Sequence, residues 1–313
     1  MVDSAPSLSV VIPVYNSSRI LPELVTRLEP VLAREARTFE LILVDDHSRD
    51  ESWRVVRELS ELHPWIRGIR LMRNYGQHNA LLCGIRTVRH EIVLTMDDDL
   101  QHPPDQIPIL LAKLAQGNDV VYGSPREERH GLWRDLSSVV TKFVLQKAMS
   151  SRTASRSSAF RAFRTPLRDA FANYQSQFVS IDVLLTWGTT RFEAVDVRHD
   201  ARREGQSNYT FRKLVVHALN MLTGFSVFPL QLASWIGFAS TLLGLLILVY
   251  VVGRYLLEGS GVPGFPFLAS IVALFSGAQL FALGIMGEYL ARMHFRMLER
   301  PAYTVGERTF GES

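Results

Sequence analysis

Apolar runs and amphipathic stretches alternate along the first 204 residues of the chain. The apolar runs predict buried strands at Leu8–Val14, Glu40–Val44, Ile69–Leu71, Glu91–Met96 and Asp119–Gly123. The intervening stretches have helical spacing or capping residues, and they predict helices at 21–34, 51–62, 79–88 and 103–116. Continuous apolar strands that alternate with helices are typical of a parallel sheet covered on both faces. Residues 1–204 are therefore predicted to form an α/β domain with a mainly parallel sheet.

Two long apolar stretches dominate the end of the chain. Residues 230–252 and 265–287 carry no charge, and each is long enough to cross about 30 Å of hydrocarbon as a helix. The linker between them is short and rich in Gly and Pro, so residues 228–291 are predicted to form a transmembrane hairpin. The alternative is a buried helical hairpin in a soluble protein. It is disfavoured because nothing else in the chain can cover so much apolar surface.

Basic residues flank the hairpin on its outer sides: Arg212, Lys213, Arg292, Arg296 and Arg300. The connecting loop has only Arg254, beside Glu258. By the positive-inside bias, the α/β domain and a tail at 292–313 are both predicted to be cytoplasmic, at the plasma membrane. Basic and apolar residues mix over 205–227, which predicts an amphipathic helix on the membrane lipid surface. Packing of that helix on the α/β domain is the alternative.

Polar residues gather where the predicted strands end. The clusters are Tyr15–Asn16, Asp45–Asp46, Arg73–Asn74 and Asp97–Asp99. In parallel sheets, ligands bind beyond the carboxyl ends of the strands. Turn chemistry explains one such cluster but not four at one edge, so a ligand site is predicted there.

Asp97 and Asp99 occupy alternate positions after a buried strand. Alternate residues of an extended segment project to the same side, so both carboxylates can hold one divalent cation. Oxygen ligands suit Mg²⁺ or Mn²⁺, and such a cation neutralises charge on a diphosphate. A D-x-D pattern is common by itself. The prediction therefore depends on its place at a strand end beside the other clusters.

The composition limits which partners and which covalent links the chain is expected to have. The net charge is +3, and almost all Lys+Arg residues are arginine, whose planar fork suits phosphate contacts. No basic tract interleaved with aromatic residues is present, so no nucleic-acid partner is predicted. Cys83 is the only cysteine, which excludes an intrachain disulfide, and it is predicted to be a small buried hydrophobe in a helix.

Several motifs together resemble glycosyltransferase family 2: V-V-I-P-V-Y-N at 10–16, L-V-D-D-H-S-R-D at 43–50 and M-D-D-D-L-Q-H-P-P at 96–104. R-N-Y-G-Q-H-N-A at 73–80, G-I-M-G-E-Y-L at 284–290 and the apolar stretches are similar to the polyprenyl-phosphate glycosyltransferase branch. The resemblance implies a GT-A nucleotide-sugar-binding fold and an inverting, metal-dependent enzyme. Its donor is a nucleotide-sugar, by default a UDP-sugar, and its acceptor is polyprenyl (undecaprenyl) phosphate. It implies a homo-oligomer of the bacterial inner membrane that makes lipid-linked sugar for the cell envelope.

The resemblance and the polar clusters together imply roles for single residues. The metal ligands are Asp97, Asp99 and Gln101. The nucleotide side comprises Pro13, Tyr15, Asn16, Asp45, Asp46, Arg73, Asn74 and Asp98. The acceptor phosphate is held by Arg126, Arg134, Ser138, Arg202 and Ser207. The catalytic set is Asp97, Asp99, Arg126 and Arg134.

The chain departs from the pattern at two places. Asn208 stands where the family has a lysine, and Ser155, Ser157 and Ser158 stand where some relatives carry an Asp that has been considered a base. A phosphate monoester has a second pKa of about 6 and is already ionised near neutral pH, so its oxygen needs no strong base. Catalysis then depends on positioning and charge stabilisation.

Two other functions compete with this interpretation. A processive polysaccharide synthase uses the same donor domain, but it carries a Q-x-x-R-W motif and more spans, and this chain has no Arg-Trp pair. A non-catalytic membrane tether that binds sugar nucleotides is disfavoured by the complete set of Asp97, Asp99 and Gln101. The sugar, the nucleotide base and the prenyl chain length stay open.

Overall fold

The computed structural model describes residues 5–125, 156–176, 178–200, 227–258, 264–298 and 300–311. The chain divides into two compact units. The first takes the chain up to Val215 together with the residues from Glu299 onward, and the second takes Val216–Leu298. The predicted amphipathic helix, up to residue 226, lies outside the described residues.

Within the described residues, the first unit contains an eight-stranded sheet of order β7-β5-β6-β4-β1-β2-β3-β8. The strands are β1 (Ser7–Val14), β2 (Thr38–Asp45), β3 (Ile66–Leu71), β4 (Ile92–Thr95), β5 (Val120–Pro125), β6 (Arg161–Arg164), β7 (Phe192–Val197) and β8 (Val305–Arg308). β6 runs antiparallel to β4 and β5, β8 runs antiparallel to β3, and the other pairs are parallel. The predicted α/β class with a mainly parallel sheet is confirmed.

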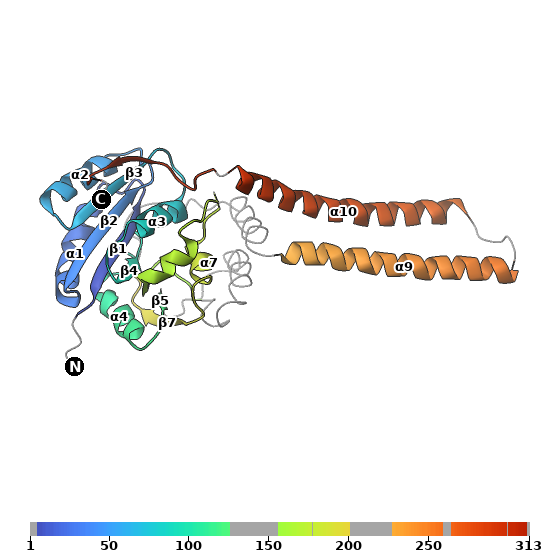
Figure 1. The fold of residues 1–313 in the computed structure, drawn as a ribbon, viewed down its shortest axis with the longest axis horizontal. Coiled ribbons are helices and arrows are strands. Elements are labelled where there is room, and N and C mark those ends of the chain that lie inside the picture. The colour runs from blue at the N-terminus through green and yellow to red at the C-terminus, as the bar shows by residue number, and fades with distance from the viewer. Residues whose placement is uncertain are drawn as a thin grey trace. The chain divides into compact units, whose positions relative to one another are not determined.

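Helices cover both faces of this sheet (Figure 1). They are α1 (Leu21–Glu35), α2 (Ser52–Leu62), α3 (Gln77–Arg86), α4 (Ile107–Ala115) and α7 (Ile181–Leu185), with 3₁₀ turns η1 (Pro104–Gln106) and η2 (Thr165–Phe171). Val10 and Ile12 of β1 pack in the same core cluster as α1, whereas Val11 points to the other face. There, a Cβ on Gly84 would lie 2.3 Å from a Val11 methyl carbon, so α3 packs against β1 too closely for a larger residue.

The end of the chain corrects the predicted tail at 292–313. The last helix runs to Met297, and residues 305–308 then form β8 at the edge of the sheet. The V-G-E-R segment is short and polar, as edge strands commonly are, so its sequence carries no apolar strand signal. In Figure 1 the red C-terminal segment lies beside β3. Both ends of the chain therefore belong to one sheet.

The second unit contains α9 (Phe228–Glu258) and α10 (Phe265–Met297). Phe275 of α10 packs on Gly244 of α9, where an added Cβ would lie 3.0 Å from the ring. The stretches Phe228–Arg254 and Leu274–His294 are long and apolar enough to cross a membrane, and the most apolar window of each is unburied. These are not the buried core helices of the alternative interpretation. The second stretch begins later than the predicted span at 265–287, although α10 contains that span.

Candidate active site

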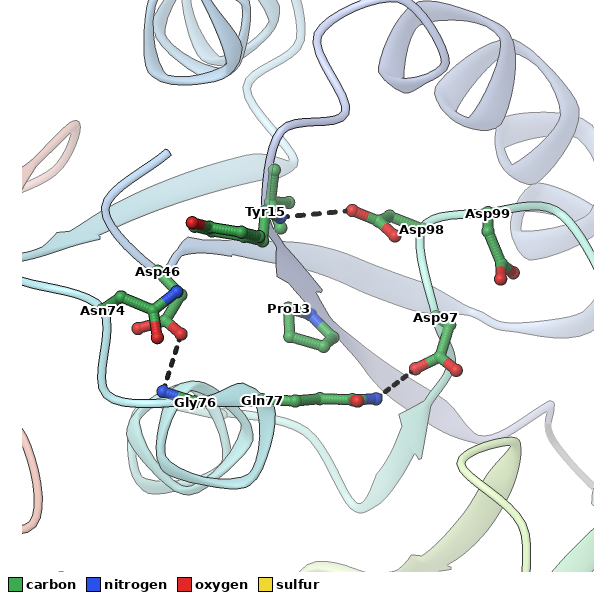
Figure 2. Close-up of a pocket in the computed structure, with 10 residues that line it drawn as sticks. Pro13, Tyr15, Asp46, Asn74, Gly76, Gln77, Asp97, Asp98 and Asp99 are labelled. Atoms are coloured by element: carbon green, nitrogen blue, oxygen red, sulfur yellow. Dashed lines mark hydrogen bonds between the residues drawn. The ribbon is translucent and has the colours of Figure 1, made fainter. Parts of the chain in front are cut away.

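A cavity of about 260 Å³ opens at the carboxyl ends of β1, β2 and β4, beside the first turn of α3 (Figure 2). It is lined by Pro13, Val14, Tyr15, Asp46, Asn74, Gly76, Gln77, Asp97, Asp98 and Asp99. Each of the four predicted polar clusters contributes at least one of these residues. The parallel topology brings the strand ends together, which is the physical reason that clusters so far apart in the sequence line one space.

Three non-glycine residues near these strand ends have left-handed backbone. Asn16, His47 and Leu100 have φ values of 56°, 56° and 58°. Such conformations cost roughly 1–3 kcal/mol each and persist where the surroundings hold them. For Asn16, the surroundings are visible: its N–H donates to Ser48 Oγ at 3.0 Å, and its Oδ1 accepts the Arg49 N–H at 2.8 Å. The loops after β1 and β2 are thereby tied together.

Asp98 braces the loop that carries Tyr15. Its Oδ2 accepts the Ser17 hydroxyl at 2.5 Å and the Tyr15 N–H at 3.4 Å. Burial raises the pKa of Asp98 to about 6, against the lowering effect of these hydrogen bonds. Figure 2 shows the Asp98 carboxylate directed toward Tyr15, and those of Asp97 and Asp99 directed away from it.

Asp46 holds the loop before α3. Its two carboxylate oxygens accept the N–H groups of Tyr75 and Gly76, each at 2.7 Å. Gly76 has φ of 93°, a conformation that suits glycine, and its carbonyl accepts from the first turn of α3. Burial raises the pKa of Asp46, although the two N–H donors lower it. This clamp places Asn74 and Gln77 against the cavity.

Asp97 and Asp99 are held by separate partners. Asp97 Oδ1 accepts the Gln77 side-chain amide at 2.5 Å, and Asp99 Oδ1 accepts the Gln101 N–H at 3.1 Å. The backbone turns at Asp98–Asp99 instead of continuing as the predicted extended segment. Both carboxylates nevertheless line the cavity.

This pair fits a divalent cation that takes its remaining ligands from a diphosphate and water. The described residues hold no group of three or more His, Cys, Asp or Glu close enough to bind a metal alone. Gln101, the predicted third ligand, does not line the cavity. The protein itself therefore supplies few metal ligands, and the substrate has to complete the site.

Other predicted residues lie away from the cavity or outside the described residues. Asp45 is fully buried: its Oδ1 accepts the Ser48 N–H at 3.1 Å, and its Oδ2 lies 3.5 Å from Arg70 Nε. Arg73 stacks on the Tyr75 ring, 4.6 Å from its centroid. Asn16 braces its loop, as described above. Outside the described residues lie Arg126, Arg134, Ser138, Ser155, Arg202, Ser207 and Asn208.

Gln77 and Gly76 line the cavity but were not among the predicted site residues. The motif N-Y-G-Q-H contained them, and its glycine before a helix start was the available signal. Ser158, near the position of the Asp in some relatives, accepts the Phe160 N–H at 3.2 Å. Its hydroxyl therefore has a local role in the turn before β6.

The family model described as glycosyl transferase family 2 matches residues 9–171, more than half of the chain. The chain belongs to glycosyl transferase family 2. All ten residues that line the cavity fall inside the matched segment of this transferase.

Relatives of nearly the same length show to which branch of family 2 the chain is similar. The undecaprenyl-phosphate 4-deoxy-4-formamido-L-arabinose transferase of Shewanella sediminis is 34% identical over 311 residues, covering 98% of this chain and 93% of that protein. The enzyme of the same name from Pectobacterium carotovorum is 34% identical over 309 residues, covering 97% and 94%. The predicted polyprenyl-phosphate glycosyltransferase branch of family 2 is confirmed.

Solved structures of other transferases share the fold. Mannosyl-3-phosphoglycerate synthase from Rubrobacter xylanophilus superposes with a TM-score of 0.52 at 18% identity, covering 83% of this chain and 79% of that chain. Glucosyl-3-phosphoglycerate synthase from Mycobacterium tuberculosis gives 0.50 at 20% identity, covering 69% and 80%. This family 2 transferase therefore has the predicted GT-A fold.

Proposed function

We propose that the enzyme transfers a sugar from a UDP-sugar to undecaprenyl phosphate and releases the nucleoside diphosphate. The observation that carries the proposal is the cavity in which Asp97 and Asp99 meet the first turn of α3. It occurs in a chain whose full-length relatives bear the name undecaprenyl-phosphate 4-deoxy-4-formamido-L-arabinose transferase.

The nucleotide lies along the β1 side of the cavity in this proposal. Tyr15 is 41% exposed, and its ring and Pro13 both border the cavity, so they offer a flat apolar surface to a base (Figure 2). The amide of Asn74 borders the same space and both donates and accepts hydrogen bonds. The N–H groups at the start of α3, with the helix dipole, favour the negative diphosphate.

Mg²⁺ or Mn²⁺ is the cofactor of this proposal, and Asp97 and Asp99, which both line the cavity, would hold it. When bound, the cation neutralises charge on the departing diphosphate. The chain's own contribution is to orient the ligands. Gln77 donates to Asp97 and so fixes one carboxylate, and the Gln101 N–H fixes the other.

The acceptor phosphate oxygen attacks the anomeric carbon of the sugar on the face opposite the leaving group. A bond from that carbon to the acceptor oxygen forms as the bond to the diphosphate oxygen breaks, so the anomeric configuration inverts. No proton has to be removed because the phosphate is already ionised. In this proposal the acceptor phosphate is held by Arg126, Arg134, Ser138, Arg202 and Ser207. Two of these residues, Arg126 and Arg134, complete the catalytic set with Asp97 and Asp99.

The path of the chain supports the proposed membrane arrangement. β1 to β7 precede α9 and α10, and β8 follows them, yet all belong to one sheet. The chain must therefore cross a membrane an even number of times between Val197 and Val305, which fits two spanning helices. The positive-inside bias supports a position of the α/β domain at the cytoplasmic face of the bacterial inner membrane, where the lipid acceptor would present its phosphate.

Incubation of the purified enzyme with a panel of nucleotide-sugars and undecaprenyl phosphate, followed by mass analysis of the lipid, tests the proposal. The expected lipid product is undecaprenyl phosphate that carries a single sugar. A polymer would instead support a processive synthase. Binding of a nucleotide-sugar without any turnover would support a non-catalytic tether.

A further inference from the structure

Three charged residues form a row across the last three strands of the sheet. Asp45 of β2 is paired with Arg70 of β3, and Arg70 is paired with Glu307 of β8. Directly paired residues of adjacent strands have neighbouring side chains. Arg70 Nε lies 3.5 Å from Asp45 Oδ2, and Arg70 Nη1 donates to Glu307 Oε1 at 3.1 Å. Glu307 also accepts the Trp53 indole N–H at 3.1 Å.

The Asp45 end of this row is buried, and the Glu307 end is exposed. Asp45 has no exposed surface, and its Oδ2 accepts no hydrogen bond within the described residues. A buried carboxylate is costly unless a positive charge lies close to it. Arg70 supplies that charge, and Glu307 helps to hold the guanidinium in place from the far side.

The same row reaches the cavity through the loops after β2 and β1. Asp45 Oδ1 accepts the Ser48 N–H at 3.1 Å, and Ser48 Oγ accepts the Asn16 N–H at 3.0 Å. Asn16 directly follows Tyr15, which lines the cavity. A continuous path of contacts therefore leads from the last strand of the chain to Tyr15.

A second contact reaches the opposite wall of the cavity. Thr304 accepts the Met72 N–H through its carbonyl at 2.9 Å. It also lies close enough to the Tyr75 phenol to lower its pKa, which burial alone would raise. Tyr75 lies between Asn74 and Gly76, which both line the cavity. The loop before α3 is thus held by Asp46 on one side and by Thr304 on the other.

We propose that residues 302–310, which follow the second long helix, are a positioning element of the donor site and act through Arg70 and Tyr75. This inference rests on the proposed use of the cavity for a nucleotide-sugar. It means that the donor site is completed only by residues from beyond the hairpin. A chain cut before the hairpin would lack this element.

The test uses the full-length enzyme in detergent and measures the Kd of UDP with Mn²⁺ by calorimetry. Arg70→Met is expected to raise this Kd about tenfold or more, because it leaves a buried carboxylate without its partner charge. Arg70→Lys restores part of the affinity. Glu307→Gln raises the Kd only about two- to fivefold, because that pair is half exposed. Tyr75→Phe, which keeps the ring and removes the contact to Thr304, raises it about three- to tenfold.

A steady-state measurement separates positioning from loss of fold. The KM for the donor should rise in each variant, while kcat at saturating donor and the KM for the lipid stay near wild type. The exposed Arg34→Met on α1 and the exposed Glu61→Gln on α2 are the matched controls, and both should leave the two KM values and kcat unchanged.

Binding of UDP with Mn²⁺ by the wild type tests the proposed function. The ratio of each variant's Kd to the wild-type Kd tests the positioning role. If Arg70→Met and Tyr75→Phe keep the wild-type Kd and only lower the Tm, residues 302–310 stabilise the edge of the sheet without positioning the donor site. The inference is then overturned. Should Arg70→Met not fold, the milder Arg70→Lys, Glu307→Gln and Tyr75→Phe variants decide by the same ratio. Absence of wild-type binding overturns both proposals.

Discussion

The side-chain amide of Gln77 donates a 2.5 Å hydrogen bond to Asp97 and so joins the first turn of α3 to the acidic turn after β4 (Figure 2). Gln77→Met keeps the length of the side chain but removes this donor. The free energy of binding UDP with Mn²⁺ should weaken by roughly 1.5–3 kcal/mol, the scale of one hydrogen bond to a charged group. Calorimetry on the variant and on the exposed control Gln116→Met checks this. Equal affinities would show that Asp97 needs no such support.

Removal of the Asp99 carboxylate should strongly lower the rate of transfer while the protein stays folded and in the membrane. Asp99→Ala is expected to lower kcat/KM by about two to three orders of magnitude, the range for loss of one group that stabilises developing charge. Treatment of the wild type with EDTA should have the same effect, reversed by Mg²⁺ or Mn²⁺. The exposed Asp169→Ala is the control. Full activity of Asp99→Ala in EDTA contradicts the metal assignment.

The topology can be read with single cysteines because the native Cys83 is buried. Gly264 lies between the two long helices, and Gly311 follows β8. An impermeant maleimide added to the outside of intact cells should label Gly264→Cys and leave Gly311→Cys unlabelled. The reason is that β8 belongs to the sheet of the α/β domain, which the proposed arrangement puts in the cytoplasm. Labelling of Gly311→Cys in intact cells is incompatible with the hairpin.

Asp119 ties β5 to the residues before β7. It accepts two hydrogen bonds from Arg191, both at 2.9 Å, and one from Thr189 at 2.6 Å. Burial alone would raise the pKa of Asp119, but these donors outweigh it and lower the pKa below its ordinary value. A carboxyl group whose pKa is lower in the folded state than in the unfolded state stabilises the fold at pH values above its unfolded-state pKa. That stabilisation is lost as the pH falls through the folded-state pKa.

Asp119→Asn should therefore lower the free energy of unfolding by about 1–2 kcal/mol at pH 7. The difference from wild type should shrink as the pH is lowered below about 4, where the native carboxyl also takes up its proton. Urea unfolding in a non-ionic detergent at several pH values measures it, with the exposed Asp169→Asn as control. A difference that is constant with pH would mean that the charge of Asp119 is not what matters.

The acceptor side is tested at Arg134. Arg134→Lys keeps the positive charge but loses the fork that binds phosphate through two parallel hydrogen bonds. The expected loss is roughly 1–3 kcal/mol in kcat/KM for the lipid, with little change in the Kd of UDP with metal. The exposed Arg34→Lys is the control. If the donor affinity collapses and the lipid dependence stays normal, Arg134 belongs to the nucleotide side.

The predicted strands and helices up to Val121 lie within a few residues of the observed ones. They were readable because a buried strand is a continuous apolar run and a covering helix has its own period. The strands after that point were not predicted. β6 has charged ends, β7 is half-exposed at one edge, and β8 is polar at the other edge, so none has a wholly apolar run.

The neighbouring acids Asp45 and Asp46 show where sequence reasoning stopped at the site. Both were assigned to the nucleotide side, from the family resemblance together with their place at a strand end. Only Asp46 borders the cavity, whereas Asp45 faces Arg70. Successive residues of a strand point to opposite sides, and the pairing of β2 with β3 decides which neighbour each one meets.

The sequence by itself determined the family, the α/β alternation, the strand ends that line the cavity and the two long apolar helices. Each of these is written in local patterns or in motifs a few residues long. Only the tertiary structure decided that Gln77 supports Asp97, that Asp45 is buried against Arg70, and that the chain returns after its second long helix to close the sheet. Arg70 and Glu307 are 237 positions apart, and no local pattern encodes a pairing that depends on the fold of everything between them.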